Sequence, residues 1–361
     1  MCFWGNTVNL NDVINQLVEE KGLDRNLLNA IICEGMLAAY KKKFPDFDLR
    51  VDYDKKTGDL ETKIKKIVVS SVDDEDREIS LRKAKNIDSK AEAGNEIWVP
   101  FEGSIGRIEI LKAKQVIADK IRSIESEIVY KAFKDRENTI IQGTINRCEK
   151  GGALIKIQDA LAFLPNSLSI PGEKCIVGYP IRALLKEVLK EPRNESQLIL
   201  DRKSPEFLKE LFELEIPEVF EKLVEVKKIV RSAGYKSKVI VTSNDPNIDP
   251  VGTCIGVGGA RIKPILKEIG GERIDVIHWS DNPAALIKDA LKPAQIERVE
   301  IEDRVAKVWL DEDQRSLAIG KMGQNISLAS QLSGYEIQLV EKANNKKKEM
   351  ESEEQEQVYE E

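Results

Sequence analysis

Two short glycine-containing loops decide the interpretation of this sequence: "CIGVGGARIKPI" at residues 254–265 and "AIGKMGQNISLA" at residues 318–329. Each loop lies between an apolar segment and a segment with a helical pattern. Glycine inside or beside a helix costs about 1 kcal/mol relative to alanine. Two such breaks at matching places indicate that something must come very close to the backbone.

The segments around the two loops repeat the same order of predicted elements: strand, short helix, glycine loop, helix and strand. The first copy begins with "SKVIVTS" and ends with "RIDVIHW", and the second begins with "AKVWLD" and ends with "YEIQLVE". Gly270 lies eleven positions after Gly259, and Gly334 lies eleven positions after Gly323. A shared spacing within a shared order of elements indicates an internal duplication.

Three kinds of glycine loop compete for this pattern. A Walker phosphate loop requires GxxxxGK[ST], which neither copy has. A dinucleotide fingerprint requires a third glycine, where Arg261 stands, and should follow a strand directly. A KH domain instead joins two helices by a GxxG loop that clamps the backbone of a single nucleic-acid strand.

The KH interpretation fits the physical needs of such a clamp. Glycine lets phosphates approach without a Cβ in the way, and the following helix presents free N–H groups and the positive end of its dipole. Basic side chains beside the loops supply cations. The RNA-binding residues predicted here are Gly256, Val257, Gly258, Gly259, Arg261, Lys263, Gly320, Lys321, Met322, Gly323 and Gln324.

Two further regions are candidates for RNA contact. Arg231, Lys236 and Lys238 cluster in "VRSAGYKSKV", which is either an RNA-binding surface or a solvated hairpin tip. Residues 137–203 show several short strand patterns separated by glycine turns, which predicts a small barrel of the OB type. Phe163 is the main aromatic candidate for base stacking in this barrel, which is poor in aromatic residues.

Composition limits the class of protein. The chain has 361 residues, of which 33% are charged, and its net charge is −7. Global charge therefore argues weakly against nucleic acid, and the local arrangement of basic residues must decide. The sequence has no apolar run of membrane-spanning length and begins without a secretory signal, so we expect a cytoplasmic protein that does not enter the membrane.

Cysteine and histidine usage argues against metal sites and catalysis. The five cysteines, Cys2, Cys33, Cys148, Cys175 and Cys254, are scattered, which indicates reduced thiols without a disulfide framework. The single histidine, His278, has no nearby partner for zinc or for a catalytic triad. The carboxylates of "DDED" at residues 73–76 could in principle hold a metal for RNA cleavage, but the stretch has the pattern of a polar turn. We expect no metal, no cofactor and no enzymatic activity.

These patterns predict an α+β multidomain protein. The predicted parts are an N-terminal α/β head with a long connecting helix, an OB-type β-barrel, two tandem prokaryotic-type KH domains and an acidic disordered tail. Their predicted boundaries are 1–136, 137–203, 204–282, 283–343 and 344–361.

Several stretches resemble those of one family, the NusA family of bacterial transcription elongation and termination factors. Besides the two KH loops, they are "GRIEILKAKQVI" at residues 106–117, "AFLPNSLSIPGE" at residues 162–173 and "SPEFLKELFELEIPEV" at residues 204–219. The resemblance covers about residues 8–343. One departure is Val257 and Gly258, which stand where a basic residue often sits in that family.

The resemblance implies a non-enzymatic factor. Its N-terminal domain would dock on core RNA polymerase, and its barrel and KH domains would bind nascent single-stranded RNA. It would modulate pausing, intrinsic termination and antitermination, as a monomer and together with other Nus-type antitermination factors. The alternative is a general single-stranded RNA-binding protein, associated with ribosomes or mRNA, that does not dock on the polymerase.

Overall fold

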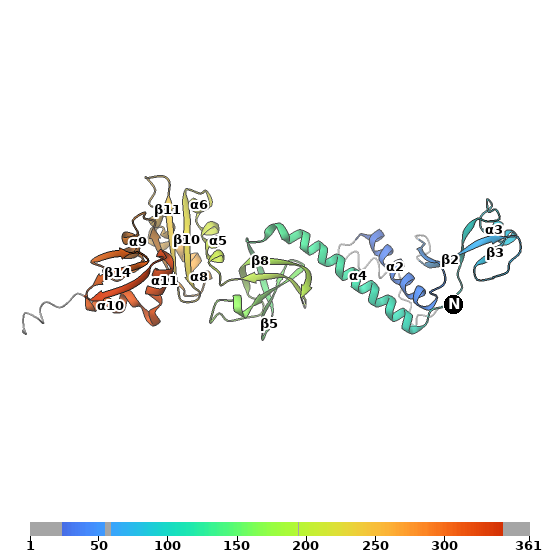
Figure 1. The fold of residues 1–361 in the computed structure, drawn as a ribbon, viewed down its shortest axis with the longest axis horizontal. Coiled ribbons are helices and arrows are strands. Elements are labelled where there is room, and N and C mark those ends of the chain that lie inside the picture. Colours follow the sequence, from blue (N-terminus) through green and yellow to red (C-terminus); the bar gives the residue numbers. More distant parts are fainter. Residues whose placement is uncertain (1–23, 55–58, 194, 342–361) are drawn as a thin grey trace, which may run out of the picture. The chain divides into compact units, whose positions relative to one another are not determined.

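The computed structural model describes residues 24–54, 59–193 and 195–341. The chain divides between Ile128 and Val129 into two compact units, which we treat separately (Figure 1). No helix in the described ranges is long and apolar enough to span a membrane. The predicted acidic tail lies outside the described residues.

The first unit combines a small sheet with two packed helices. Strand β2 pairs with β1 and β4 in antiparallel fashion and with β3 in parallel fashion, which confirms the predicted α/β character. Gly35 brings helices α2 and α4 together, because an added Cβ would lie 2.3 Å from Ile117 Cγ1. The elements are α2 (Arg25–Lys43), β1 (Leu49–Tyr53), β2 (Leu60–Val69), β3 (Glu78–Ser80), α3 (Leu81–Ile87), β4 (Glu96–Pro100) and α4 (Arg107–Phe133).

Helix α4 is the predicted long helix. Its 27 residues correspond to about 40 Å at the rise of an α-helix. Ile117, Ile121 and Ile124 pack against α2 in the first unit. In the second unit, Tyr130 and Phe133 pack into the core of the barrel, next to the short 3-10 helix η1 (Lys134–Arg136).

The second unit begins with a closed five-stranded barrel, as predicted. The strand order is β5-β6-β7-β9-β8, and side chains of β7 alternate between the interior and the outer surface. Gly152 is required where β6 begins, because a Cβ there would lie 2.2 Å from the carbonyl oxygen of Leu164. The strands are β5 (Ile140–Glu149), β6 (Gly152–Ile157), β7 (Ala160–Pro165), β8 (Pro180–Arg193) and β9 (Ser196–Asp201), with η2 (Asn166–Leu168) after β7.

One disulfide corrects the expectation from the sequence. Cys148, at the end of β5, is bonded to Cys175, in the segment before β8, with the two Cα atoms 6.1 Å apart. The prediction of reduced thiols was wrong for this pair, because closure of the barrel brings together two residues that lie 27 positions apart in the sequence. Cys33 and Cys254 are free thiols.

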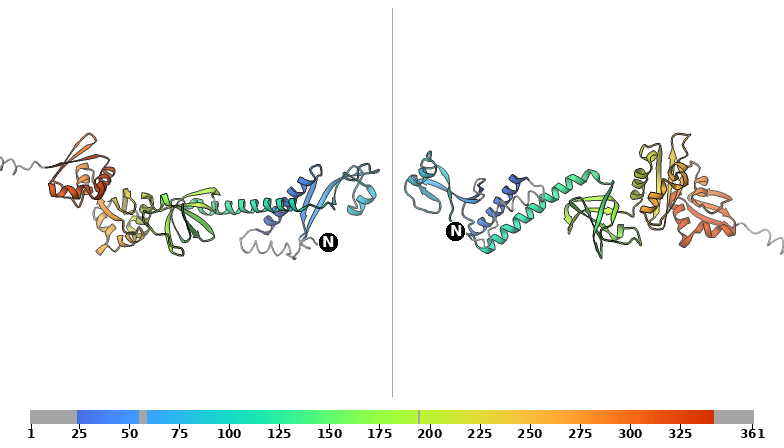
Figure 2. Two further views of the ribbon diagram at one scale, coloured as in Figure 1. Left: turned by 90° about the horizontal axis from the view of Figure 1, so that it is seen from below. Right: turned by 180° about the vertical axis from the view of Figure 1, so that it is seen from behind.

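Two domains of like topology follow the barrel (Figure 2). Both contain the predicted order of strand, short helix, glycine loop, helix and strand, preceded by one further strand and by helix α9 in the second domain or helices α5 and α6 in the first. In each domain the middle strand pairs antiparallel with the preceding strand and parallel with the last one. The first domain contains α5 (Pro205–Glu215), α6 (Pro217–Phe220), β10 (Val224–Ser232), β11 (Lys236–Ser243), α7 (Pro250–Ile255), η3 (Val257–Gly259), α8 (Ile262–Glu268) and β12 (Arg273–His278). The second contains α9 (Pro283–Ala290), β13 (Arg298–Glu302), β14 (Val305–Leu310), α10 (Glu312–Ile319), η4 (Lys321–Gly323), α11 (Gln324–Ser333) and β15 (Glu336–Glu341).

The two KH domains share a hydrophobic core. Val239 and Val241 of β11 pack against the helices of their own domain, whereas Ile240 faces the second domain and joins its core with Leu328 and Leu332 of α11. Figure 1 shows α11 between the first domain and strand β14. The amine of Lys228 donates to the carbonyl oxygens of Gln331 and Leu332, both at 2.8 Å, at the negative end of α11.

Candidate nucleic-acid interface

The two GxxG loops, residues 256–259 and 320–323, adopt the same backbone conformation. Gly256 has φ 73° and ψ 166°, and Gly320 has φ 71° and ψ 175°. The third positions also match, since Gly258 has φ 60° and ψ 21° and Met322 has φ 56° and ψ 26°. The duplication seen in the sequence is therefore a duplication of loop geometry, although only one copy has glycine at the third position.

The two glycines of the second loop are required for different reasons. A Cβ on Gly320 would lie 2.7 Å from Asn325 Cβ, so this position needs glycine for close packing as well as for its positive φ. A Cβ on Gly323 would meet no atom within 4 Å, so only its φ of 73° requires glycine. The space beside Gly323 is therefore open to an approaching phosphate.

The tips of both loops stand out from the surface. Val257 is 97% exposed and Met322 is 89% exposed. Lys321 and Lys263 are also exposed, and their amines make no hydrogen bond or ion pair with any residue that the structure describes. These two loops thus combine accessible backbone with unpaired positive charge.

The side chain of Arg261 is hydrogen-bonded to residues next to the first loop and is not free. Its guanidinium donates to the carbonyl oxygen of Thr253 at 2.9 Å and to Glu218 Oε1 at 2.5 Å. Gln324, the first residue of α11, has its Oε1 atom buried without a hydrogen-bond partner among the described residues. Both predicted residues therefore lie at the loops, but neither presents a free charge.

The predicted basic cluster on β10 and β11 is internal. The side chain of Arg231 is fully buried and forms an ion pair with Glu272 at 2.9 Å, and it also donates to two backbone carbonyl oxygens. Lys238 is buried beside Asp275 at 2.8 Å; burial lowers the pKa of Lys238, and Asp275 only partly opposes that effect. Lys236 contacts Asp275 and donates to Asn325 Oδ1 at 3.1 Å. The sequence predicted either an RNA-binding surface or a solvated hairpin tip. Neither alternative fits these side chains, because they are paired with residues inside the protein.

Phe163 lies on the outer face of β7, half-buried. It pairs across the sheet with Leu154 and Ile199, and its ring lies near Gly151. Phe163 is therefore on the second strand after the glycine turn, and its role in base stacking stays a prediction.

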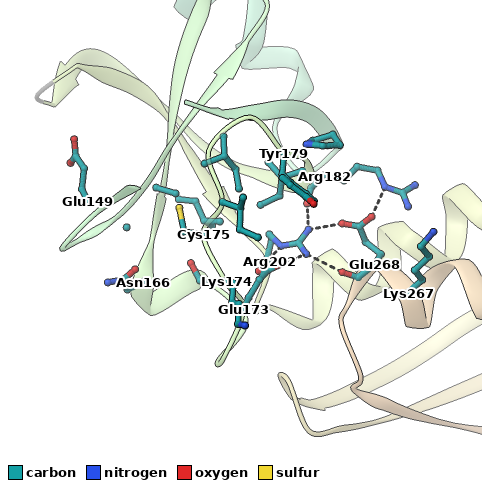
Figure 3. A pocket seen from close by; sticks show the side chains of 18 of the residues that line it. Glu149, Asn166, Glu173, Lys174, Cys175, Tyr179, Arg182, Arg202, Lys267 and Glu268 are labelled. Atoms are coloured by element: carbon teal, nitrogen blue, oxygen red, sulfur yellow. Dashed lines mark hydrogen bonds and ion pairs between the residues drawn. The ribbon is translucent and has the colours of Figure 1, made fainter. Parts of the chain in front are cut away.

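A cavity of about 720 Å³ lies where the barrel meets α8 of the first KH domain (Figure 3). Its wall includes an Arg–Glu network: Arg202, with its side chain only 2% exposed, pairs with Glu268 at 2.7 Å and with Glu173 at 2.5 Å. Arg182 pairs with the same Glu268 at 2.8 Å. Lys174, Lys267 and Tyr179 also line the cavity. None of these three was among the predicted site residues. For Lys267 the available signal was its position four residues after Lys263, on the same face of a helix.

The described residues offer little for metal or thiol chemistry. They contain no group of three His, Cys, Asp or Glu side chains that could hold a metal ion. The carboxylates at residues 73–76 lie in an exposed turn, where Glu78 accepts from the backbone N–H of Asp73 at 2.8 Å. Burial raises the pKa of the Cys254 thiol to about 12, so it is protonated at neutral pH.

A closed barrel followed by two KH domains with exposed GxxG loops defines a multidomain RNA-binding protein. The sequence matches models of the NusA N-terminal domain over residues 9–127, the NusA-like first KH domain over residues 202–279 and the NusA-like second KH domain over residues 283–347. These matches cover most of the chain on either side of the barrel.

Full-length relatives agree with the domain matches. The transcription termination/antitermination protein NusA of Halalkalibacterium halodurans is 34% identical over 91% of this chain and 87% of its own length. The corresponding protein of Thermus thermophilus is 37% identical over 83% and 78%, and that of Bacillus subtilis is 33% identical over 91% and 89%. The chain belongs to the NusA family of transcription termination/antitermination proteins.

Proposed function

We propose that this protein is a transcription termination/antitermination factor that binds RNA polymerase through its N-terminal domain and nascent single-stranded RNA through its KH loops. It is a transcription factor and not an enzyme. The observation that carries the proposal is the pair of GxxG loops with one backbone conformation, on two KH domains that share a core, in a member of the NusA family.

The loops hold RNA by its backbone. A phosphate approaches the open side of Gly323, where the positive end of α11 and the free amine of Lys321 stabilise its charge. Lys263 supplies the unpaired cation beside the first loop. The exposed side chains of Val257 and Met322 offer apolar surface to the bases. Affinity therefore falls with salt, since each phosphate contact releases counterions.

The proposed partners follow from the family relationship. Core RNA polymerase binds the N-terminal domain, and other Nus-type factors join in antitermination complexes. The protein acts as a monomer in the cytoplasm, where bacterial transcription takes place. Within this role it lengthens hairpin-stabilised pauses and biases the choice between termination and antitermination.

The lifetime of a hairpin-stabilised pause on purified bacterial RNA polymerase tests the proposal. We expect the protein to lengthen the pause and Lys321→Ala to shorten it again. Lys321→Ala should also reduce the slope of log affinity against log salt by about one, because one phosphate contact is lost. Lys292→Ala is the matched control, since Lys292 is 72% exposed in the same domain but is paired with Asp289.

Two outcomes would contradict the proposal. If the pause lifetime is unchanged at a protein concentration that saturates free RNA, the protein does not act on RNA polymerase. It would then be a general RNA-binding protein. Equal effects of Lys321→Ala and Lys292→Ala would show that overall charge, and not the second loop, carries the RNA contact.

A further inference from the structure

Unpaired cations lead from the first loop to the cavity between the barrel and the first KH domain. Lys263 and Lys267 are four residues apart on α8, so their side chains lie on one face about 6 Å apart along the helix axis. Lys263 lies beside Gly259, and Lys267 lines the cavity. Neither amine has a hydrogen bond or ion pair within the described ranges, and neither does that of Lys174 on the barrel side.

The arginines of the cavity wall do not provide free positive charge for binding an anion. Its two arginines are already paired with carboxylates. Arg202 pairs with Glu173 and Glu268 (Figure 3). Arg182 pairs with Glu268 and with Glu215, which lies outside the cavity wall. Free positive charge is therefore supplied by the lysines, while the rest of the wall is mixed in polarity. Its volume of about 720 Å³ is in the range of small-ligand sites, which combine apolar walls with a few polar groups.

Tyr179 adds an aromatic surface to this wall. It is 60% exposed, yet its backbone is fixed, since its N–H donates to Ile176 at 3.2 Å and its carbonyl oxygen accepts from Ile145 at 2.9 Å. The disulfide at Cys175 holds the same segment to the end of β5. A large ring that is exposed on a fixed backbone is suited to stacking on a nucleobase.

We propose that this cavity binds one nucleotide of the RNA strand held by the first GxxG loop. The base stacks on Tyr179 inside the cavity, and the adjoining phosphates lie along Lys263, Lys267 and Lys174. This inference rests on the proposed function, because it needs RNA on the first loop. It assigns the barrel–KH junction a binding role apart from the loops themselves.

The test is a double-mutant cycle between Tyr179 and individual bases. Full-length protein is titrated with single-stranded RNA oligonucleotides that carry one abasic site at successive positions. If Tyr179 stacks on one base, then removal of that base or of the ring each weakens binding about tenfold, and removal of both weakens it no further. Tyr179→Trp should bind RNA with about the wild-type affinity, because an indole ring can also stack on a base. Val177→Ala is the matched control, since Val177 is 61% exposed in the same segment but does not line the cavity.

Oligonucleotide length provides a second readout. An RNA of about four nucleotides occupies a KH loop alone, so its affinity should not respond to Tyr179→Ala. Independent losses at every abasic position, or an equal loss for short and long RNA, would overturn the inference. If wild-type protein binds RNA and Lys321→Ala weakens it while Tyr179→Ala does not, only this inference falls. If wild-type protein binds no RNA, the proposed function falls with it.

Discussion

Gly320 and Gly323 provide a matched pair for measuring what each glycine of a KH loop contributes. Both have positive φ, but their backbones differ. Gly323, with φ 73° and ψ 10°, lies in the left-handed region, where alanine costs about 1–2 kcal/mol. Gly320, with φ 71° and ψ 175°, lies in a region that essentially only glycine adopts. Only Gly320 also packs closely, against Asn325. We expect Gly320→Ala to destabilise the second KH domain by about 1–3 kcal/mol more than Gly323→Ala, as measured by urea unfolding.

The same pair separates stability from RNA binding. The new methyl group of Gly323→Ala stands in open space, where a phosphate would approach, so this variant should lose RNA affinity while it keeps most of its stability. The main effect of Gly320→Ala should instead be a loss of stability of the second KH domain. Equal stability of the two variants would contradict this, because it would show that neither the backbone of Gly320 nor its packing against Asn325 requires glycine.

The disulfide between β5 and the segment before β8 has a measurable stability effect. It closes a loop of 27 residues, which corresponds to about 3–4 kcal/mol in the chain-entropy description. Replacement of Cys148 and Cys175 by serine should lower the free energy of unfolding of the barrel by about this amount. A reductant should destabilise wild-type protein and leave the double variant unchanged. If reductant has no effect on wild-type protein, the two thiols are not bonded in solution.

The junction between the barrel and the first KH domain should weaken in acid. Burial alone would raise the pKa of Glu268, but Arg202 and Arg182 outweigh burial and lower it below 4.5. A carboxyl whose pKa is lowered in the folded state stabilises the protein above its unfolded pKa, and this contribution disappears as the pH falls through the folded value. Glu268→Gln should therefore cost about 2–3 kcal/mol at pH 7 and progressively less below pH 4.5. Urea unfolding across this pH range checks it, and a constant difference would contradict it.

The local sequence pattern predicted the helices and strands of both KH domains. It did not predict contacts between residues that are far apart in the sequence. Strand alternation, loop glycines and the capping glycines Gly270 and Gly334 act within a few residues, and all are in the predicted places. The partners of Arg231 and Lys238 are Glu272 and Asp275, more than 30 positions away, so their burial could not be inferred from the sequence. Lys267 and Tyr179 were missed for the same reason, because the cavity forms only when the barrel meets α8.

We expect the shared core of the KH domains to determine how the second unit holds RNA. Because α11 starts at the second loop and packs against the sheet of the first domain, the second loop is fixed relative to that sheet. RNA that reaches both loops then gains from a high effective concentration at the second contact. RNA that is long enough to reach only one loop should gain no affinity from the contact between the two KH domains.

Neighbouring residues of β11 allow this coupling to be tested. Ile240 faces α11 and Val239 faces the first domain's own helices, and both are fully buried. Ile240→Ala and Val239→Ala should each cost about 2–4 kcal/mol, but only Ile240→Ala should release α11, as shown by faster amide hydrogen exchange in that helix. Affinity for RNA that spans both loops should then fall toward the affinity for short RNA. If Val239→Ala lowers the affinity for long RNA to the same extent, the loss reflects destabilisation of the first domain, and the shared core is not what aligns the loops.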